Sequence, residues 1–447
     1  MIFFKHFHFA LYTLLVFQPL FLFSESTEKQ QSLEQCIEYG LKNSPVLKQA
    51  MISHEDRMLQ TAIAKARYIF DINYSTDYQV EEEQHNNSLS LSQDIIGGIN
   101  VSAAGAANYD NESDSDNASL SITLSKKLLG SGSSFLESSE AIIEGLVGET
   151  IALNNIRKAK RKLRQEISQS YYRVIRDVQS LGIRERRLEM SKQTLEHAKV
   201  REQPLDIITA EIEIPQNELA LLQAEEQIKN GLDNLKEIIG MPILQTLEID
   251  PVFNFQSVEL NTASDIEFSL NNHEDTLNNR LELKRLQDDY KISRKNILPD
   301  VSTSASHREL SKGDEINLQG DAEHTIGLNF SWKFGGARKR ANYKIARNAI
   351  RRNELSYYSL TQSKTKSIIR LSRQLNELKR SIILQEERLS LNERQIELYK
   401  DRWENGEIGI LELVRSQSSL EDGKVSLINQ KINYLEQLTE YQFEIGK

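Results

Sequence analysis

The sequence is poor in residues that interrupt or cross-link a chain. Only 20 glycines and 7 prolines occur among 447 residues. Because these residues punctuate secondary structure, their scarcity predicts long uninterrupted elements, mainly helices. The single cysteine, Cys36, excludes an intramolecular disulfide framework and any site built on a CxxC pair. We interpret Cys36 as a helix residue and leave lipidation open, since Glu34 and Gln35 before it make a poor lipoprotein motif.

Long hydrophobic runs are also missing after the first two dozen residues, where none approaches the ~20 residues of a spanning helix. This excludes a polytopic helical membrane protein, but not a membrane β-barrel, whose strands leave a weaker hydropathy signal. The net charge of −10 argues against nucleic acid as a partner. At the start, Lys5, the apolar stretch 7–23 and Ser24-Glu25-Ser26 predict a signal peptide over residues 1–26.

Motifs of enzymes and metal sites do not occur in the sequence. The 8 histidines form no HExxH pattern, and there is no Walker loop, GxGxxG or GxSxG. We therefore expect no enzyme activity, no cofactor and no metal. The basic runs 158–162 and 338–340 are interpreted as solvated helix faces.

The remaining chain contains one pattern twice. Residues 37–43 recur as 266–272, and at the same offset 69–72 match 298–301. A heptad stripe follows in each copy: Ile167, Val174, Leu181, Leu188 and Leu195 correspond to Ile368, Leu375, Ile382, Leu389 and Ile396. This ordered series predicts an internal duplication.

Each copy has the order helix, strands, long helix, turn and shorter helix. In the first copy we expect an opening helix over about 33–67 and a long helix from about 135 to 200. Alternating apolar residues predict at least two strands in each copy, hence about four in a chain. The stretch 84–116 either adds a hairpin or lengthens a loop.

The long helix of about 66 residues would extend ~100 Å, too far for one ordinary core. Its heptad stripe requires a partner of equal length. We expect helices 205–240 and 265–297 to stack end to end along it. We expect the opening helix to take part in a second end-to-end stack of the same kind. We predict that Leu181, Leu188, Ile382 and Leu389 are buried between helices.

The strands cannot close a sheet within one chain, because four open strands leave two exposed edges. Three chains would bring about twelve strands, which is adequate for closure around a lumen. A soluble β-sandwich is the alternative for these segments. Heptad helices alone would also suit a dimeric coiled coil.

Several short motifs, in this order and spacing, resemble the TolC-like outer membrane efflux proteins. They are Leu298-Pro299 before a strand, Phe334-Gly335-Gly336 at a strand-to-helix junction, Trp403-Glu404-Asn405-Gly406 before a returning helix, and Gly240-Met241-Pro242. The resemblance implies an α+β membrane protein that forms a homotrimer. It also implies a twelve-stranded outer-membrane β-barrel continued by an α-helical coiled-coil tunnel in the periplasm.

The implied function is the exit duct of a tripartite efflux or type I secretion system. Its partners would be a periplasmic adaptor protein, an inner-membrane transporter of the RND, ABC or MFS type, and outer-membrane lipid. The alternative is a secreted coiled-coil scaffold or adaptor without a pore.

The corresponding segments are a signal peptide (1–26), a tunnel helix (27–67), strands (68–134), a helical hairpin (135–240), an equatorial linker (241–264), a second tunnel helix (265–298), strands (299–336) and a second helical hairpin (337–447).

The resemblance also implies site residues at the closed periplasmic end of the tunnel. Asp206, Glu412, Arg415 and Trp403 fall on gate or lumen positions, and Pro204, Gly406 and Ile408 on the hairpin tips that contact the adaptor. Gly335 and Gly336 fall on the strand-to-helix junction. Three positions depart from the family pattern: Trp403 replaces a tyrosine, Ile408 an arginine and Arg415 an acidic residue. For Asp206 and Glu412, a solvated charge at a helix start is an equal alternative.

Overall fold

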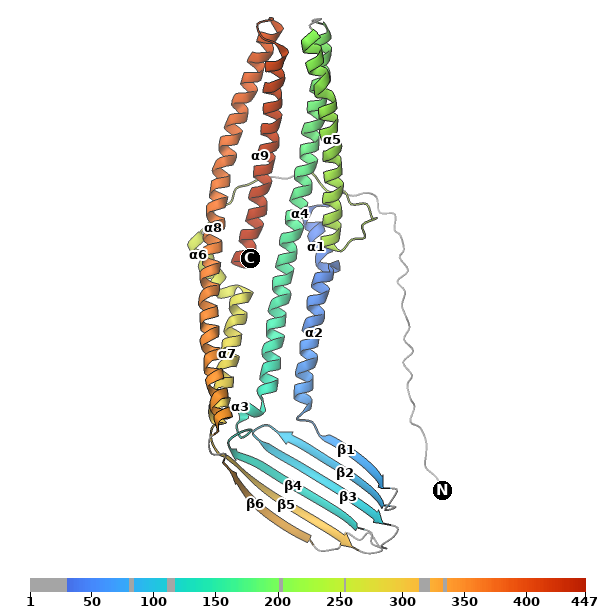
Figure 1. Cartoon of the computed structure of the whole chain (residues 1–447), viewed down its shortest axis with the longest axis vertical. Helices are drawn as coiled ribbons and strands as arrows, with labels where there is room; N and C mark the ends of the chain where they lie inside the picture. Colours follow the sequence, from blue (N-terminus) through green and yellow to red (C-terminus); the bar gives the residue numbers. More distant parts are fainter. Residues whose placement is uncertain are drawn as a thin grey trace, which may run out of the picture.

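The computed structural model describes residues 30–79, 84–110, 117–200, 204–252, 255–312, 322–332 and 336–447. Long helices extend from one side of a single sheet (Figure 1). The predicted signal peptide and Gly335 lie outside the described residues.

The described residues of the first half of the chain form five helices. They are α1 (Leu33–Asn43), α2 (Pro45–Ala66), α3 (Phe135–Ser138), α4 (Glu140–Val200) and α5 (Pro204–Ile239). Ser32 caps α1, since its hydroxyl accepts a hydrogen bond from the Gln35 backbone N–H while the Gln35 side chain accepts one from the Ser32 N–H. Pro45 starts α2, where its missing N–H removes no intrahelical bond.

Where the structure describes the second half, it contains four more, α6 (Thr262–Asn272), α7 (Glu274–Lys295), α8 (Ala337–Glu404) and α9 (Ile410–Ile445). Within the described residues, no helix combines the length and the apolarity needed to cross a membrane.

The helices form two layers along the rod. Near the sheet, α2, α4, α7 and α8 pack in a row, and farther away the row is α5, α4, α9 and α8 (Figure 1). The two long helices α4 and α8 therefore run through both layers.

The stacking of the shorter helices differs from the expectation that 205–240 continues into 265–297. Instead α5 meets α1, and α9 meets α6. Gly240 ends α5 with φ of +74°, and a Cβ there would lie 2.9 Å from the Asn43 carbonyl oxygen. This close approach fixes the end of α5 against the α1–α2 junction. With the contact between α9 and α6, each returning helix stacks on the opening helix of its own half.

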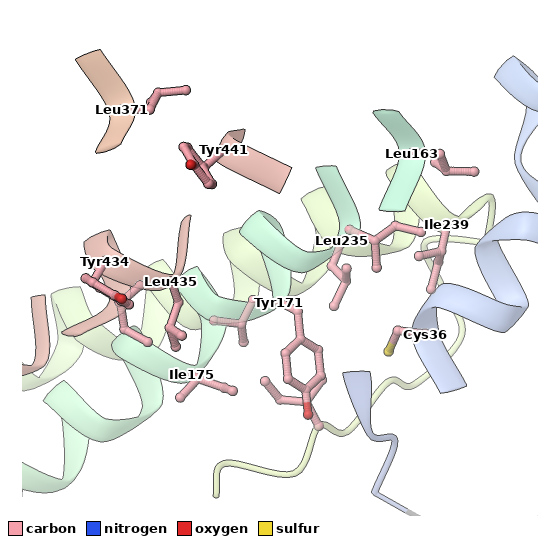
Figure 2. Close-up of a cluster of buried hydrophobic side chains, with 14 of the residues drawn as sticks. Cys36, Leu163, Tyr171, Ile175, Leu235, Ile239, Leu371, Tyr434, Leu435 and Tyr441 are labelled. Atoms are coloured by element: carbon pink, nitrogen blue, oxygen red, sulfur yellow. The ribbon is translucent and has the colours of Figure 1, made fainter. Parts of the chain in front are cut away.

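The main core lies where the two layers meet. Cys36, Tyr171, Leu235 and Tyr434 belong to it, and Figure 2 shows these side chains converging from several helices. Burial raises the pKa of the Cys36 thiol to about 11, so it stays neutral at pH 7. Cys36 is thus a buried residue of α1.

The predicted heptad burial differs between the two copies. Ile382 and Leu389 are 2% and 7% exposed, whereas Leu181 and Leu188 are only half-buried in this chain. The prediction is therefore confirmed for the second copy, and for Leu181 and Leu188 burial in the assembled protein stays a prediction. The internal duplication itself stays a prediction.

All described strands form one antiparallel sheet in the order β1-β2-β3-β4-β5-β6. They are β1 (Asp71–Gln79), β2 (Gln84–Ile95), β3 (Ile99–Asp110), β4 (Asn117–Leu129), β5 (Asp300–Lys312) and β6 (Ala322–Ser331). For the stretch 84–116, the sequence left open whether it adds a hairpin or lengthens a loop. The structure shows the hairpin β2–β3 there, with Gly97 and Gly98 in its turn at positive φ. The expected count of about four strands is therefore too low.

Candidate functional site: a two-faced sheet and the hairpin tips

Most of the large apolar side chains of the sheet lie on one face. The pairing register carries a row from Ile72 through Leu91 and Ala103 to Ile122, so their side chains share this face. Its apolar members include Ile72, Tyr74, Tyr78, Leu89, Leu91, Val101, Ala103, Leu120, Ile122, Leu124, Val301, Ala305, Ile326, Leu328 and Phe330, and the same rows also contain His307, Glu309 and His324. We call this set the apolar face.

The apolar face is open in this chain. Ile326 is 87% exposed, and Ile72, Ile122 and Leu328 are also exposed. Contiguous apolar patches of this extent are rare on proteins surrounded by water. Exposed apolar patches of this kind mark sites that contact another protein or a membrane.

The opposite face is polar and rich in serine. Ser75, Ser88, Ser121 and Ser304 lie on it, and the hydroxyl oxygens of Ser75 and Ser88 are 2.7 Å apart. A hollow lined by Asp77, Asn86, Asn108, Ser119, Arg308 and neighbouring residues lies mainly on this side. The polar face is thus the hollowed one, suited to water and hydrophilic solutes.

Charged residues connect the sheet to the helices at the strand-to-helix junction. The carboxylate of Asp300, at the start of β5, accepts a 2.7 Å hydrogen bond from the Ser131 backbone N–H and a 3.0 Å bond from the Lys339 ammonium. Gly336 immediately precedes α8. This junction ties the ends of β4 and β5 to the first turn of α8.

The interpretation of the basic runs as solvated faces is wrong for three members. Lys339 pairs with Asp300, Lys158 pairs with Asp275 at 2.6 Å, and Arg161 forms an ion pair with the buried Glu274. Sequence periodicity could not show this, because each acidic partner comes from a distant segment.

The two helical hairpins meet at the far end of the rod through an apolar cluster. Ala198, Ala210, Trp403, Ile410, Leu413 and Val414 are buried there, and Ile408 packs against them. The rings of Trp403 and His197 make an edge contact at 6.0 Å. Trp403 is thus buried within the tip of this chain, 5% exposed, and not presented on its surface.

The predicted charged residues lie around this cluster but do not pair with one another. Asp206 is half-buried in the first turn of α5, and Glu412 is exposed in the first turn of α9. Arg415 is exposed and lines a surface groove with Arg187, Arg388, Glu213 and Asp422. Among the described residues, no ion pair joins Glu412 to Arg415.

The tip residues Pro204 and Gly406 are exposed, and Gly406 has φ of +77°. Pro204 is the first residue of α5, and Gly406 lies between the end of α8 and the start of α9. The structure therefore places the predicted tip residues at one end of the rod, with the sheet at the other (Figure 1).

A buried polar cluster that the sequence did not indicate lies midway along the rod. The His273 side chain is fully buried between α6 and α7, and its Nε2 is 2.9 Å from the Lys364 ammonium. Lys364 also donates a 2.8 Å hydrogen bond to the Glu444 carboxylate and lies 3.7 Å from Asp275. Arg161 and Lys158 of α4 contribute further positive charge.

Burial and the Lys364 charge lower the pKa of His273 to about 4. As pH falls from about 6.5 to 4, the unfolded chain takes up this proton first, so the free energy of unfolding decreases over that window. We expect His273→Asn to reduce this pH dependence in thermal unfolding curves. Equal losses in the variant and the wild type between pH 7 and 4.5 would contradict the assignment.

The comparisons with known proteins agree with this architecture. The family model described as outer membrane efflux protein matches residues 266–442. No curated protein matches the sequence.

Solved channel structures share the fold at low sequence identity. The CmeC outer membrane channel of Campylobacter jejuni is 15% identical with a TM-score of 0.70, covering 93% of this chain and 85% of that one. The open-state MtrE outer membrane channel of Neisseria gonorrhoeae has the same identity, TM-score and coverage of this chain, and 88% of its own length is covered. The outer membrane protein VceC of Vibrio cholerae is also 15% identical, with a TM-score of 0.70 and coverage of 93% and 96%. The resemblance predicted from the sequence is confirmed.

Proposed function

We propose that this chain, which shares the fold of outer membrane efflux channels and matches that family over residues 266–442, is an outer-membrane exit duct. The observation that carries the proposal is the sheet with one open apolar face and one hollowed polar face. Alternation of lipid-facing and lumen-facing residues is typical of transmembrane strands, and 9 to 13 residues suffice for tilted strands to cross the hydrocarbon.

The assembled duct is a homotrimer. The outer edges of β1 and β6 have no strand partner in the described chain, and neighbouring copies would supply one. The helical rod then forms a tunnel in the periplasm. Its tips, including Pro204, Gly406 and Ile408, would face a periplasmic adaptor and an inner-membrane transporter of the RND, ABC or MFS type.

The duct passes efflux substrates or secreted proteins to the exterior, and residues 1–26 act as its signal peptide. Trimers in outer-membrane fractions and conductance in planar lipid bilayers test the proposal. A protein that remains soluble without conductance would overturn it in favour of a periplasmic scaffold. An intact N-terminus in the mass spectrum would contradict the signal peptide.

We predict that the charges at the start of α9 set ion selectivity. Trimerisation would place three copies of exposed Glu412 around a narrow opening, where like charges attract cations and salt screens their effect. We expect Glu412→Gln to reduce cation selectivity at low salt, and Arg415→Ala to increase it. Reversal potentials in a salt gradient measure both effects.

The matched control is Glu397→Gln, on an exposed position of α8 away from the turn. It removes the same charge and should leave the reversal potential unchanged. Unchanged selectivity in both tip variants would remove support for a lumen position of Glu412 and Arg415, while leaving the duct itself untouched.

A further inference from the structure

We propose that three copies of this chain build an eighteen-stranded wall, because the hairpin β2–β3 is an integral part of each six-stranded sheet. The inference rests on the proposed trimeric duct and deepens it by setting the width of the outer opening. It replaces the twelve strands expected from about four strands in each chain.

The hairpin is inserted between β1 and β4 and pairs with both. The register is continuous from Asp71–Ser92 to Gln79–Gln84 on one side and from Ile99–Lys126 to Asn108–Asn117 on the other. Its turn is anchored as well, since the Gly97 N–H donates a 2.8 Å hydrogen bond to the Ser138 hydroxyl of α3. Moving the hairpin out of the wall would break two complete ladders.

The hairpin also continues both chemical faces of the sheet. Leu89, Leu91 and Val101 extend the apolar face, while Ser88, Ser90 and Ser102 extend the polar face. A loop folded over the lumen or over the outside would not need this alternation. The hairpin is therefore built to separate lipid from water, like the strands beside it.

The two free edges are suited to pair with each other in neighbouring copies. Consecutive strands are antiparallel, so an even number per chain leaves β6 antiparallel to β1 of the next copy. Both edges have apolar residues at even positions, such as Tyr74 on β1 and Leu328 on β6. A register that pairs even with even positions joins the apolar faces without interruption.

The width of six strands also matches the helical rod. Strands 4.8 Å apart and tilted by 35–45° make a six-stranded sheet roughly 35–41 Å wide. Each helical layer has four helices in a row, and at 8–10 Å between axes this row is roughly 32–40 Å wide. A four-stranded sheet would be only roughly 23–27 Å wide by the same estimate.

The strand wall would therefore be about as wide as the helical tunnel. Barrel diameter grows about linearly with strand number, so eighteen strands give about 1.5 times the diameter and about twice the cross-section of twelve. Walls of 16–18 strands enclose an aqueous channel. The outer opening would then admit bulky hydrophilic cargo, and the helical tips would be the narrowest part of the path.

Electron cryomicroscopy of the full-length trimer in lipid nanodiscs tests the inference by counting strands. Eighteen strands with β2–β3 in the wall are expected. A trimer with twelve strands and the hairpin outside the wall would overturn the inference while preserving the duct. Failure to form a membrane trimer would overturn the proposed function, so the two failures are distinguishable.

A deletion of residues 84–110 provides an independent test, since β1 ends and β4 begins at the same edge of the sheet. Polymers of graded size, added on the sheet side of a planar bilayer, reduce conductance only if they enter. The deletion should lower the largest admitted polymer diameter by about 1.5-fold. An unchanged cutoff would contradict the inference, and if the deletion does not fold, the strand count of the wild type decides.

Discussion

Replacing Leu124 by arginine is expected to prevent most of the protein from inserting into the outer membrane. Leu124 lies in the middle of β4 on the apolar face, between Val101 and Ala305, and is 50% exposed. An arginine facing lipid near the bilayer midplane costs ~2–4 kcal/mol, and a trimer would incur this cost three times. Trimers in outer-membrane fractions, resolved on mildly denaturing gels, measure the loss.

Thr123→Arg is the matched control because Thr123 is the preceding residue of the same strand and lies on the polar face. The same side chain should be tolerated there, since it would meet water. Equal amounts of Leu124→Arg and Thr123→Arg trimers would show that the apolar face does not contact lipid, and would remove the main support for the proposed duct.

Replacing Ile382 by alanine is expected to lower the melting temperature of the assembled protein strongly. Ile382 is 2% exposed in the main core, and truncating such a residue typically costs ~2–5 kcal/mol. Leu188, in the heptad stripe of the first copy, is half-buried in the chain, so Leu188→Ala should cost less. Differential scanning calorimetry in detergent compares the two variants.

Glu387→Ala is the control for Ile382→Ala, because Glu387 is exposed on the same helix. Its effect should stay within about 0.5 kcal/mol, as for most surface substitutions. A shift for Ile382→Ala no larger than that of Glu387→Ala would contradict the packing of α8 in the core.

The long helices and their order could be predicted from the sequence because their signals are local. Few glycines and prolines, heptad stripes and glycines at the helix ends act within a few residues of chain. The hairpin β2–β3 was harder to predict, since Ala103 and Gly105 on the apolar face weaken the alternation. The Gly97-Gly98 turn was its clearest signal, and it did not distinguish a hairpin from a loop.

The surroundings of the tip residues could not be predicted from the sequence either. Trp403 was identified by resemblance as a gate residue, yet Ala198, Ala210 and Leu413 enclose it from two hairpins. Periodicity places a residue on a face of its helix but does not identify the helix that covers that face. The lumen positions of Asp206 and Glu412 stay predictions for the same reason, since neighbouring chains would define the lumen.

The sequence by itself determined the helical character of the chain, the two strand regions and the resemblance to the outer membrane efflux proteins, because these depend on residue order and short-range spacing. Only the tertiary structure decided that α5 stacks on α1 and that β2–β3 joins the sheet. It also decided that Lys339 and Arg161 pair with Asp300 and Glu274. These features depend on contacts between residues 39 or more positions apart or on pairing between whole strands, and no local pattern encodes the partner of such a contact.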